Sequence, residues 1–135
     1  MNRTEARQLA KTTLEGLGLF AHVYQSEPET FGGATPVAVL HSKSLAVALD
    51  TRDDTVLPCE FYLTIYVARP RDGDRDAVEA ALDTLGRAAV LAIWEAFGDI
   101  RDLDIRPSET GYPMRTFDNV PHRMERWAIG FTDEE

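Results

Sequence analysis

Three histidines and one cysteine are the side chains in this sequence best suited to acid–base, nucleophilic or metal chemistry at neutral pH. His22, His41 and His122 lie far apart and none belongs to an HxH or HExxH spacing, so a metal site would need them to converge from separate elements. Cys59 could act as a nucleophile only beside a histidine that lowers its pKa. It begins the apolar side of an alternating segment, where a small buried thiol is common. We therefore interpret all four as structural residues.

An acidic run, Asp72, Asp74 and Asp76, superficially resembles a calcium-binding loop. An EF-hand that starts at Asp72 requires Gly at its sixth position and Glu at its twelfth, but Ala77 and Asp83 stand there. The run leads into a predicted helix, where acidic side chains cap free N–H groups and complement the helix dipole, so we interpret it as a cap. The sequence also lacks a phosphate-binding glycine loop and a G-x-S-x-G elbow. We predict no catalytic, cofactor-binding or metal site.

Composition and charge narrow the class of protein. The chain has 135 residues, of which 44% are hydrophobic and 27% charged, which predicts one globular domain over residues 1–135. The formal net charge of −9 disfavours an ordinary nucleic-acid binder, because phosphate neutralisation needs a basic surface. No apolar run approaches the ~20 residues of a membrane span. A single cysteine and an N-terminus without an apolar core segment favour a soluble protein folded in a reducing cytoplasm.

Two helices are predicted from the spacing of apolar residues. The first follows Asn2, which with Glu5 forms a capping-box pattern, and ends near Gly16 and Gly18. The second runs over residues 74–97 and ends at Gly98. Its second half is apolar most of the way round, so it must be covered on two sides. In so small a protein, the second cover could be another subunit.

Strands are predicted at 20–25, 36–42, 45–49, 59–68, 99–106 and 123–132, and loops at 26–35, 50–58 and 107–122. The segment 59–68 alternates most clearly. Because the strands cluster instead of alternating with helices, the fold class is predicted to be α+β. We expect a mostly antiparallel sheet, with an N-terminal helix and one long central helix packed on one face.

Aromatic side chains suggest an interface. Tyr62 and Tyr66 lie on the side of strand 59–68 opposite its apolar stripe, and Trp94 lies beside the stripe of the long helix. Either a second helix covers the tyrosines, or a neighbouring subunit covers some of these aromatic side chains, since Tyr and Trp favour interfaces. The three loops are longer than simple connections require, and loops that order on docking suit an assembly protein.

Four segments stand out beside the order of elements. They are Thr4–Arg7 in the first helix, Pro36–Leu40 in a strand, the alternating strand Glu60–Arg69 that ends in Pro70, and Thr110–Arg115, which reads TGYPMR, with Asp118 close behind. In these segments and in the order of its elements, the chain resembles the tail terminator proteins of long-tailed bacteriophages, of which phage lambda's is the best-known type.

The resemblance implies an α+β subunit of a hexameric ring at the virion head–tail junction, assembled in the host cytoplasm. Such a ring caps the tail tube, stops its polymerisation and presents a surface for the head. The implied partners are further copies of the chain, the major tail tube protein and a head-completion or connector protein. Double-stranded DNA would pass through the lumen without specific binding, and no catalysis, cofactor or membrane is involved. The candidate interface residues are Phe31, Tyr62, Tyr66, Leu91, Trp94, Tyr112 and Arg115.

Two alternatives stay open. Within the same biology, the chain could be another neck, head-closure or tail-completion protein. From a different class, it could be a small cytosolic α+β enzyme or ligand-binding domain that uses His41 or Cys59 with nearby carboxylates.

Overall fold

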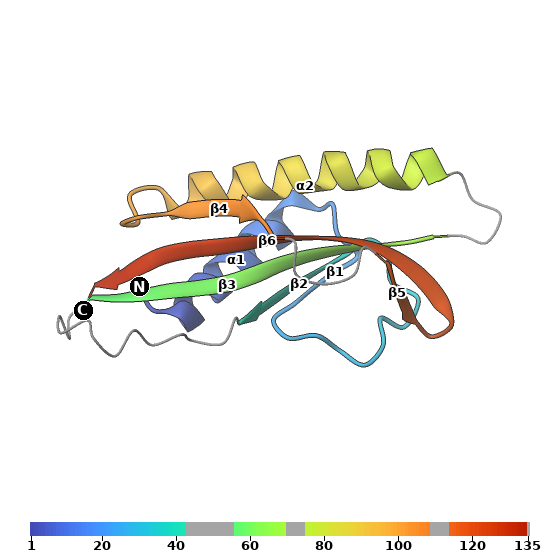
Figure 1. The fold of residues 1–135 in the computed structure, drawn as a ribbon, viewed down its shortest axis with the longest axis horizontal. Helices are drawn as coiled ribbons and strands as arrows, with labels where there is room; N and C mark the ends of the chain where they lie inside the picture. Colours follow the sequence, from blue (N-terminus) through green and yellow to red (C-terminus); the bar gives the residue numbers. More distant parts are fainter. Residues whose placement is uncertain (43–55, 70–74, 109–113, 135) are drawn as a thin grey trace.

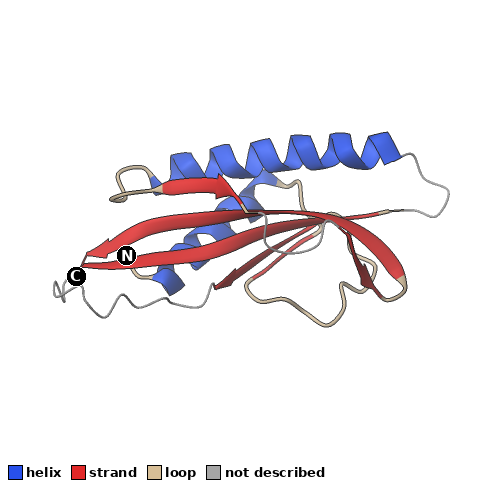
Figure 2. Cartoon of the chain, in the orientation of Figure 1, coloured by secondary structure: helices blue, strands red, loops and turns tan. Residues whose placement is uncertain are grey.

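The computed structural model describes residues 1–42, 56–69, 75–108 and 114–134. Over these ranges the fold is α+β, with two helices on one face of a mixed, mostly antiparallel six-stranded sheet (Figure 1, Figure 2). The predicted fold class is confirmed. The elements in chain order are α1 (Arg3–Leu17), β1 (His22–Tyr24), β2 (Val37–Ser42), β3 (Val56–Ala68), α2 (Arg75–Phe97), β4 (Asp104–Pro107), β5 (Met114–Phe117) and β6 (Val120–Glu134).

Helix α1 begins and ends where its capping residues predict. The Asn2 side chain accepts a hydrogen bond from the backbone N–H of Glu5 at 2.8 Å, and the Glu5 side chain accepts one from the backbone N–H of Asn2 at 3.3 Å. This reciprocal pair satisfies two N–H groups that the first turn of a helix leaves without partners. At the other end, Gly18 takes a left-handed conformation with φ of 67°, which glycine adopts without steric cost.

Strands β3 and β6 form the long centre of the sheet. They pair antiparallel without a break, from Val56 opposite Glu134 to Ala68 opposite His122. The sheet order is β1-β2-β3-β6-β4, with β5 pairing the remaining end of β6 and with β1 and β2 parallel. The alternation predicted for 59–68 is confirmed, because its apolar set lies on the face that the helices cover.

The main core lies between this face and the two helices. Helix α2 contributes a stripe of buried residues. One of them is Gly86, where a Cβ would stand 2.7 Å from Cη2 of Trp127. The absence of a side chain at Gly86 therefore makes room for the indole ring. Gly98 follows the helix with φ of 49°, as predicted for the residue after the last turn. The buried residues of α2 are Val78, Leu82, Leu85, Gly86, Ala89, Ile93 and Phe97.

Several predicted boundaries are wrong. Part of the predicted loop 107–122 is the hairpin of β5 and β6, joined by Asp118 and Asn119, which have φ of 52° and 63°. Positive φ at both positions matches the tight hairpin turn whose twist suits adjacent strands, and Asp and Asn tolerate this conformation better than most residues. Strand β3 starts at Val56 and not at the predicted Cys59. Strand β4 starts at Asp104, five residues after the predicted start of the 99–106 strand, and ends at Pro107.

Some sequence predictions fall outside the described residues. These are the predicted strand 45–49, most of the predicted loop 50–58, the acidic residues Asp72 and Asp74, and the candidate interface residue Tyr112.

Candidate functional site

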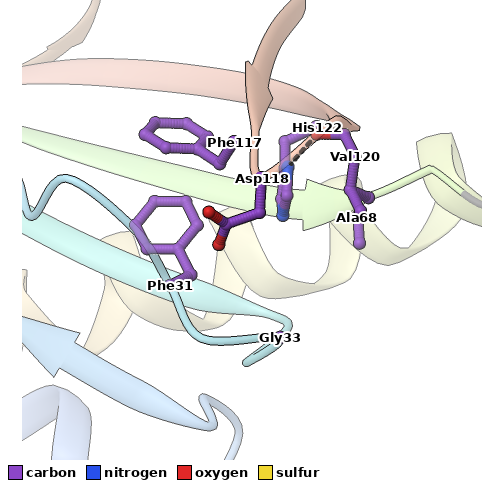
Figure 3. Close-up of a pocket in the computed structure, with 7 residues that line it drawn as sticks. All are labelled: Phe31, Gly33, Ala68, Phe117, Asp118, Val120 and His122. Atoms are coloured by element: carbon purple, nitrogen blue, oxygen red, sulfur yellow. Dashed lines mark hydrogen bonds between the residues drawn. The ribbon is translucent and has the colours of Figure 1, made fainter.

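The sheet face opposite the helices carries a second, smaller core at one end. The segment that joins β1 to β2 and the β5–β6 hairpin fold over this end. They bring Phe31 against Phe117, with ring centroids 4.2 Å apart (Figure 3), and against Tyr66, with ring centroids 5.2 Å apart. Tyr66 is therefore covered by a loop and a hairpin of the same chain, and not by a second helix. The buried members of this second core are Phe31, Val37, Val39, Tyr66, Phe117 and Met124.

This placement corrects the expectation for two candidate interface residues. Phe31 is 4% exposed and Tyr66 is 1% exposed within the single chain. Neither side chain has exposed surface to lose on assembly, so both belong to the core of the subunit. Arg115 is exposed and stands over the Phe117 ring, with its guanidinium carbon 4.9 Å from the ring centroid.

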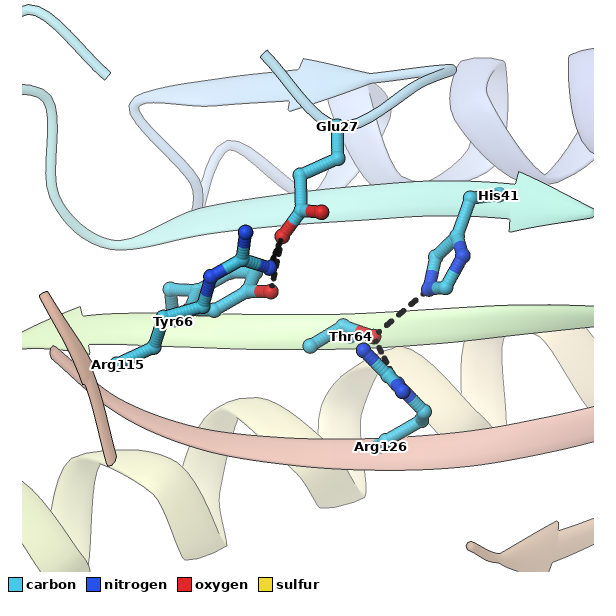
Figure 4. Close-up of polar contacts among 6 residues, drawn as sticks. All are labelled: Glu27, His41, Thr64, Tyr66, Arg115 and Arg126. Atoms are coloured by element: carbon cyan, nitrogen blue, oxygen red, sulfur yellow. Dashed lines mark hydrogen bonds and ion pairs between the residues drawn. The ribbon is translucent and has the colours of Figure 1, made fainter. Parts of the chain in front are cut away.

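Glu27 links this second core to the surface. Its carboxylate accepts a hydrogen bond from the Tyr66 hydroxyl at 2.8 Å and pairs with the Arg115 guanidinium (Figure 4). Burial and, after it, the adjacent Glu27 carboxylate together raise the pKa of Tyr66 to about 12. Partial burial opposes ionisation of Glu27, but the hydrogen bonds from Arg115 and Tyr66 outweigh it, so the pKa of Glu27 lies below its usual value.

Next to this cluster, His41, Thr64 and Arg126 form a second polar group on the same face. The Thr64 hydroxyl oxygen lies 3.3 Å from Nε2 of His41 and accepts a hydrogen bond from Nε of Arg126 at 2.9 Å (Figure 4). The guanidinium of Arg126 also lies 5.2 Å from the centroid of the Tyr62 ring, in a cation–π contact. Burial lowers the pKa of His41, and the positive charge of Arg126 lowers it further.

A third polar group lies along the same face, where β4 pairs with β6. The guanidinium of Arg106 makes ion pairs of 2.6 Å with both Glu60 and Asp104. The hydrogen bond to Asp104 and the charge of Glu60 raise the pKa of Arg106. We name the surface formed by these second and third groups the polar sheet face. It is defined by His41, Glu60, Tyr62, Thr64, Arg106 and Arg126, of which Thr64 is fully buried.

The other candidate surface lies on α2. Leu91 is 50% exposed and Trp94 is 53% exposed, and Arg87 lies one turn before Leu91 on the same side of the helix. These residues point away from the stripe that α2 buries against the sheet. We name Arg87, Leu91 and Trp94 the outer α2 stripe. About half of each of these two apolar residues is exposed within the described part of the chain.

The cysteine and the remaining histidines lack the features of a reactive centre. Burial raises the pKa of the Cys59 thiol, and the Asp133 charge raises it further, whereas a nucleophilic cysteine needs a lowered pKa. The ring of His22 packs against the ring of Tyr24 in a tilted arrangement, with the centroids 4.2 Å apart. His122 is buried, with its Nδ1 2.8 Å from the Val120 carbonyl oxygen. Within residues 1–42, 56–69, 75–108 and 114–134, no three His, Cys, Asp or Glu side chains gather in a way that could hold a metal ion.

Sequence reasoning found the side of the sheet that carries the polar sheet face, but it missed the contacts on and beside that face. The period of two already placed Glu60 and Thr64 beside Tyr62, and Arg126 on the outward side of its strand. It could not place Glu27, which comes from a loop 39 residues before its partner Tyr66, and it could not pair Arg106 with Glu60.

No helix in the described ranges combines the length and apolar character needed to cross a membrane. Comparison with protein-family models and with curated protein sequences gives no match for this chain.

Proposed function

We propose that this chain is a structural subunit of a bacteriophage tail, and specifically a tail terminator. Six copies would form a ring that caps the tail tube, stops its polymerisation and joins the tail to the head. Its partners would be its own copies, the major tail tube protein and a head-completion or connector protein. The proposal extends the sequence resemblance. The observation that carries it is the presence of two separate surfaces on opposite sides of one subunit, the outer α2 stripe and the polar sheet face.

Two such surfaces are what a closed ring requires. In a cyclic assembly each subunit contacts both neighbours through different patches, and the ring closes when the rotation between subunits is right. The outer α2 stripe offers Leu91 and Trp94, and Trp is enriched among residues that dominate binding energy. The polar sheet face offers Tyr62 with Arg126 above its ring, a pair that can pack against an indole and still make hydrogen bonds.

Charge supports the same function and constrains it. A ring of six copies, each with a formal net charge of −9, would carry −54. A negative lumen repels DNA phosphates, so DNA could pass through it without binding. Because the copies also repel one another, apolar and hydrogen-bonded contacts must hold the ring together.

The alternatives make different predictions about assembly and gene context. Another neck, head-closure or tail-completion protein would also assemble, but on the head side of the junction. A small cytosolic enzyme or ligand-binding domain would stay monomeric and would be encoded among metabolic genes. Genes for a major tail protein and a tape-measure protein just downstream would support the terminator.

The decisive test measures assembly with light scattering after size exclusion and with negative-stain images, alone and with the tail tube protein. The expected particle is a ring of six times the 15.1 kDa subunit mass. Trp94→Glu should weaken assembly at least about tenfold while leaving the fold intact, because a buried charge would replace an interface aromatic. Leu19→Glu is the matched control, since Leu19 is 41% exposed but lies outside the outer α2 stripe. A monomer under every condition, or an unchanged ring in Trp94→Glu, would contradict the proposal.

A further inference from the structure

A small cavity lies at the second core, beside the β5–β6 hairpin (Figure 3). Its volume of about 110 Å³ is below that of pockets for drug-sized ligands, which run about 300–1,000 Å³. An engineered apolar cavity of about 150 Å³ nevertheless holds benzene, so this cavity can accept a group of a few heavy atoms. The side chains that line it are Phe31, Ala68, Phe117, Asp118, Val120 and His122.

Two polar side chains line this cavity, those of Asp118 and His122, and Gly33 adds only backbone. Nδ1 of His122 lies 2.8 Å from the Val120 carbonyl oxygen; a carbonyl can only accept, so Nδ1 carries the proton and donates. In the neutral ring Nε2 is then an acceptor, and no hydrogen bond to it is found within the described residues. Asp118 accepts the Thr30 hydroxyl through Oδ2, which leaves Oδ1 available. Both residues line the same cavity, and Figure 3 shows the Asp118 carboxylate turned toward Phe31.

This combination defines the kind of group that fits. Two side-chain acceptors select a ligand that donates hydrogen bonds, and a carboxylate beside aromatic rings favours a cation. The Phe117 ring already receives one cation, since Arg115 stands over it with its charge balanced by Glu27. A short alkyl chain would pack against Phe31, Ala68 and Val120, whose surfaces are apolar.

We propose that this cavity binds a compact alkylammonium group, with Asp118 and His122 accepting two of its N–H bonds and the phenylalanine rings enclosing its alkyl stem. The group is either a free small amine or the end of a lysine side chain from another protein, and both offer the same chemistry to the cavity. This site is independent of the outer α2 stripe and of the polar sheet face.

The test titrates the full chain with n-propylammonium chloride and follows the backbone ¹H–¹⁵N NMR signals. The expected result is saturable shifts centred on Ala68, Asp118, Val120 and His122, with a millimolar Kd, as befits so small a ligand. 1-Propanol and sodium propionate, which match its size but not its charge, should bind at least about tenfold more weakly. Equal binding of propanol, or no shifts up to about 50 mM propylammonium, would overturn the proposal.

Two variants and a control test the residues. Asp118→Asn removes the charge but tolerates the left-handed backbone at this position, where φ is 52°, and should weaken binding at least about tenfold. Ala68→Leu should abolish binding by filling the cavity without touching its polar groups. Asp99→Asn, an exposed residue outside the cavity, should bind as the natural protein does. Unchanged binding in a folded Asp118→Asn or Ala68→Leu protein would refute the site.

An Nα-acetyl-lysine amide separates the two sources of the ammonium group. Saturable binding of this probe at the same residues supports a lysine side chain as the ligand, and binding of propylammonium alone supports a free amine. Failure of both probes overturns the proposal.

Discussion

The contact between Gly86 and Trp127 provides a sharp test of how α2 packs on the sheet. A Cβ at position 86 would lie 2.7 Å from Cη2 and 2.8 Å from Cζ2 of the indole, whereas ordinary contact begins at 3.4 Å. Gly86→Ala would therefore force the ring, or the helix, to withdraw by about 0.7 Å. Because the ring packs against the main core, it has little freedom to do so.

Two opposing effects set the size of the change in stability. Alanine in the middle of a helix is favoured over glycine by about 1 kcal/mol, and overpacking of a core costs about 1–3 kcal/mol. We expect Gly86→Ala to lower the free energy of unfolding by about 1 kcal/mol. In a Trp127→Leu background the collision is gone, so the same substitution should raise the free energy of unfolding by about 0.5–1 kcal/mol.

The assay is urea denaturation followed by circular dichroism, applied to all four members of the double-mutant cycle. The predicted coupling between the two positions is about 1.5–2 kcal/mol. Gly16→Ala is the matched control. Gly16 lies in α1 with no atom within 4 Å of a Cβ placed there, so this change should stabilise the protein in both backgrounds. An equal effect of Gly86→Ala with and without Trp127 would refute the reasoning.

Two further predictions concern the cap of α1 and the ion pair of the second core. Asn2→Ala should lower the free energy of unfolding by about 1 kcal/mol, because it leaves the backbone N–H of Glu5 without its acceptor. Urea denaturation measures this change, and Asn2→Asp, which keeps an acceptor, should lose far less. The pKa of Glu27 is lower in the folded chain than its usual value, so its contribution is present above about pH 4.3 and is lost as the pH falls through the folded pKa. Glu27→Gln should therefore flatten the fall of stability with pH in this acidic range. Glu29→Gln, at an exposed position nearby, is the control, and an unchanged pH profile in Glu27→Gln would show that the ion pair contributes nothing in solution.

Residues close in the sequence were enough to predict the helices and most strands. The prediction about Tyr66 failed because it depends on a contact between residues far apart in the sequence. Asn2, Glu5 and Gly18 reveal α1 because a cap depends on residues three or four positions apart. The role of Tyr66 depends on Phe31, which lies 35 positions earlier in the chain and folds over it. No local sequence pattern predicts that contact. Tyr66 was therefore expected to be exposed on the outer side of its strand and to take part in an interface.

The β5–β6 hairpin was missed for a related reason. Proline and glycine between 107 and 122 favour a loop, yet Pro121 lies in β6 opposite Thr116. Proline is tolerated there because it only lacks a donor: its carbonyl still accepts a hydrogen bond from the N–H of Arg69 at 2.8 Å. For Leu91 and Trp94, helical spacing was enough to predict that the side chains are exposed, because exposure on a single helix depends only on which side of the helix faces the sheet.

The pairing of β3 with β6 also determines how quickly the chain can fold. Helix α1 needs only neighbouring residues to form, but the sheet pairs Ala68 with His122, 54 positions apart, and Val56 with Glu134, 78 positions apart. Closing such loops costs chain entropy before any contact rewards it, and folds dominated by distant pairs form in about milliseconds to seconds. The ladder should therefore start at its Ala68 end, where the loop is shortest, and zip toward the two termini. The last pairs to form would be those near Val56 and Glu134, next to the N-terminus that Asp133 holds through a 3.6 Å ion pair with the Met1 amine.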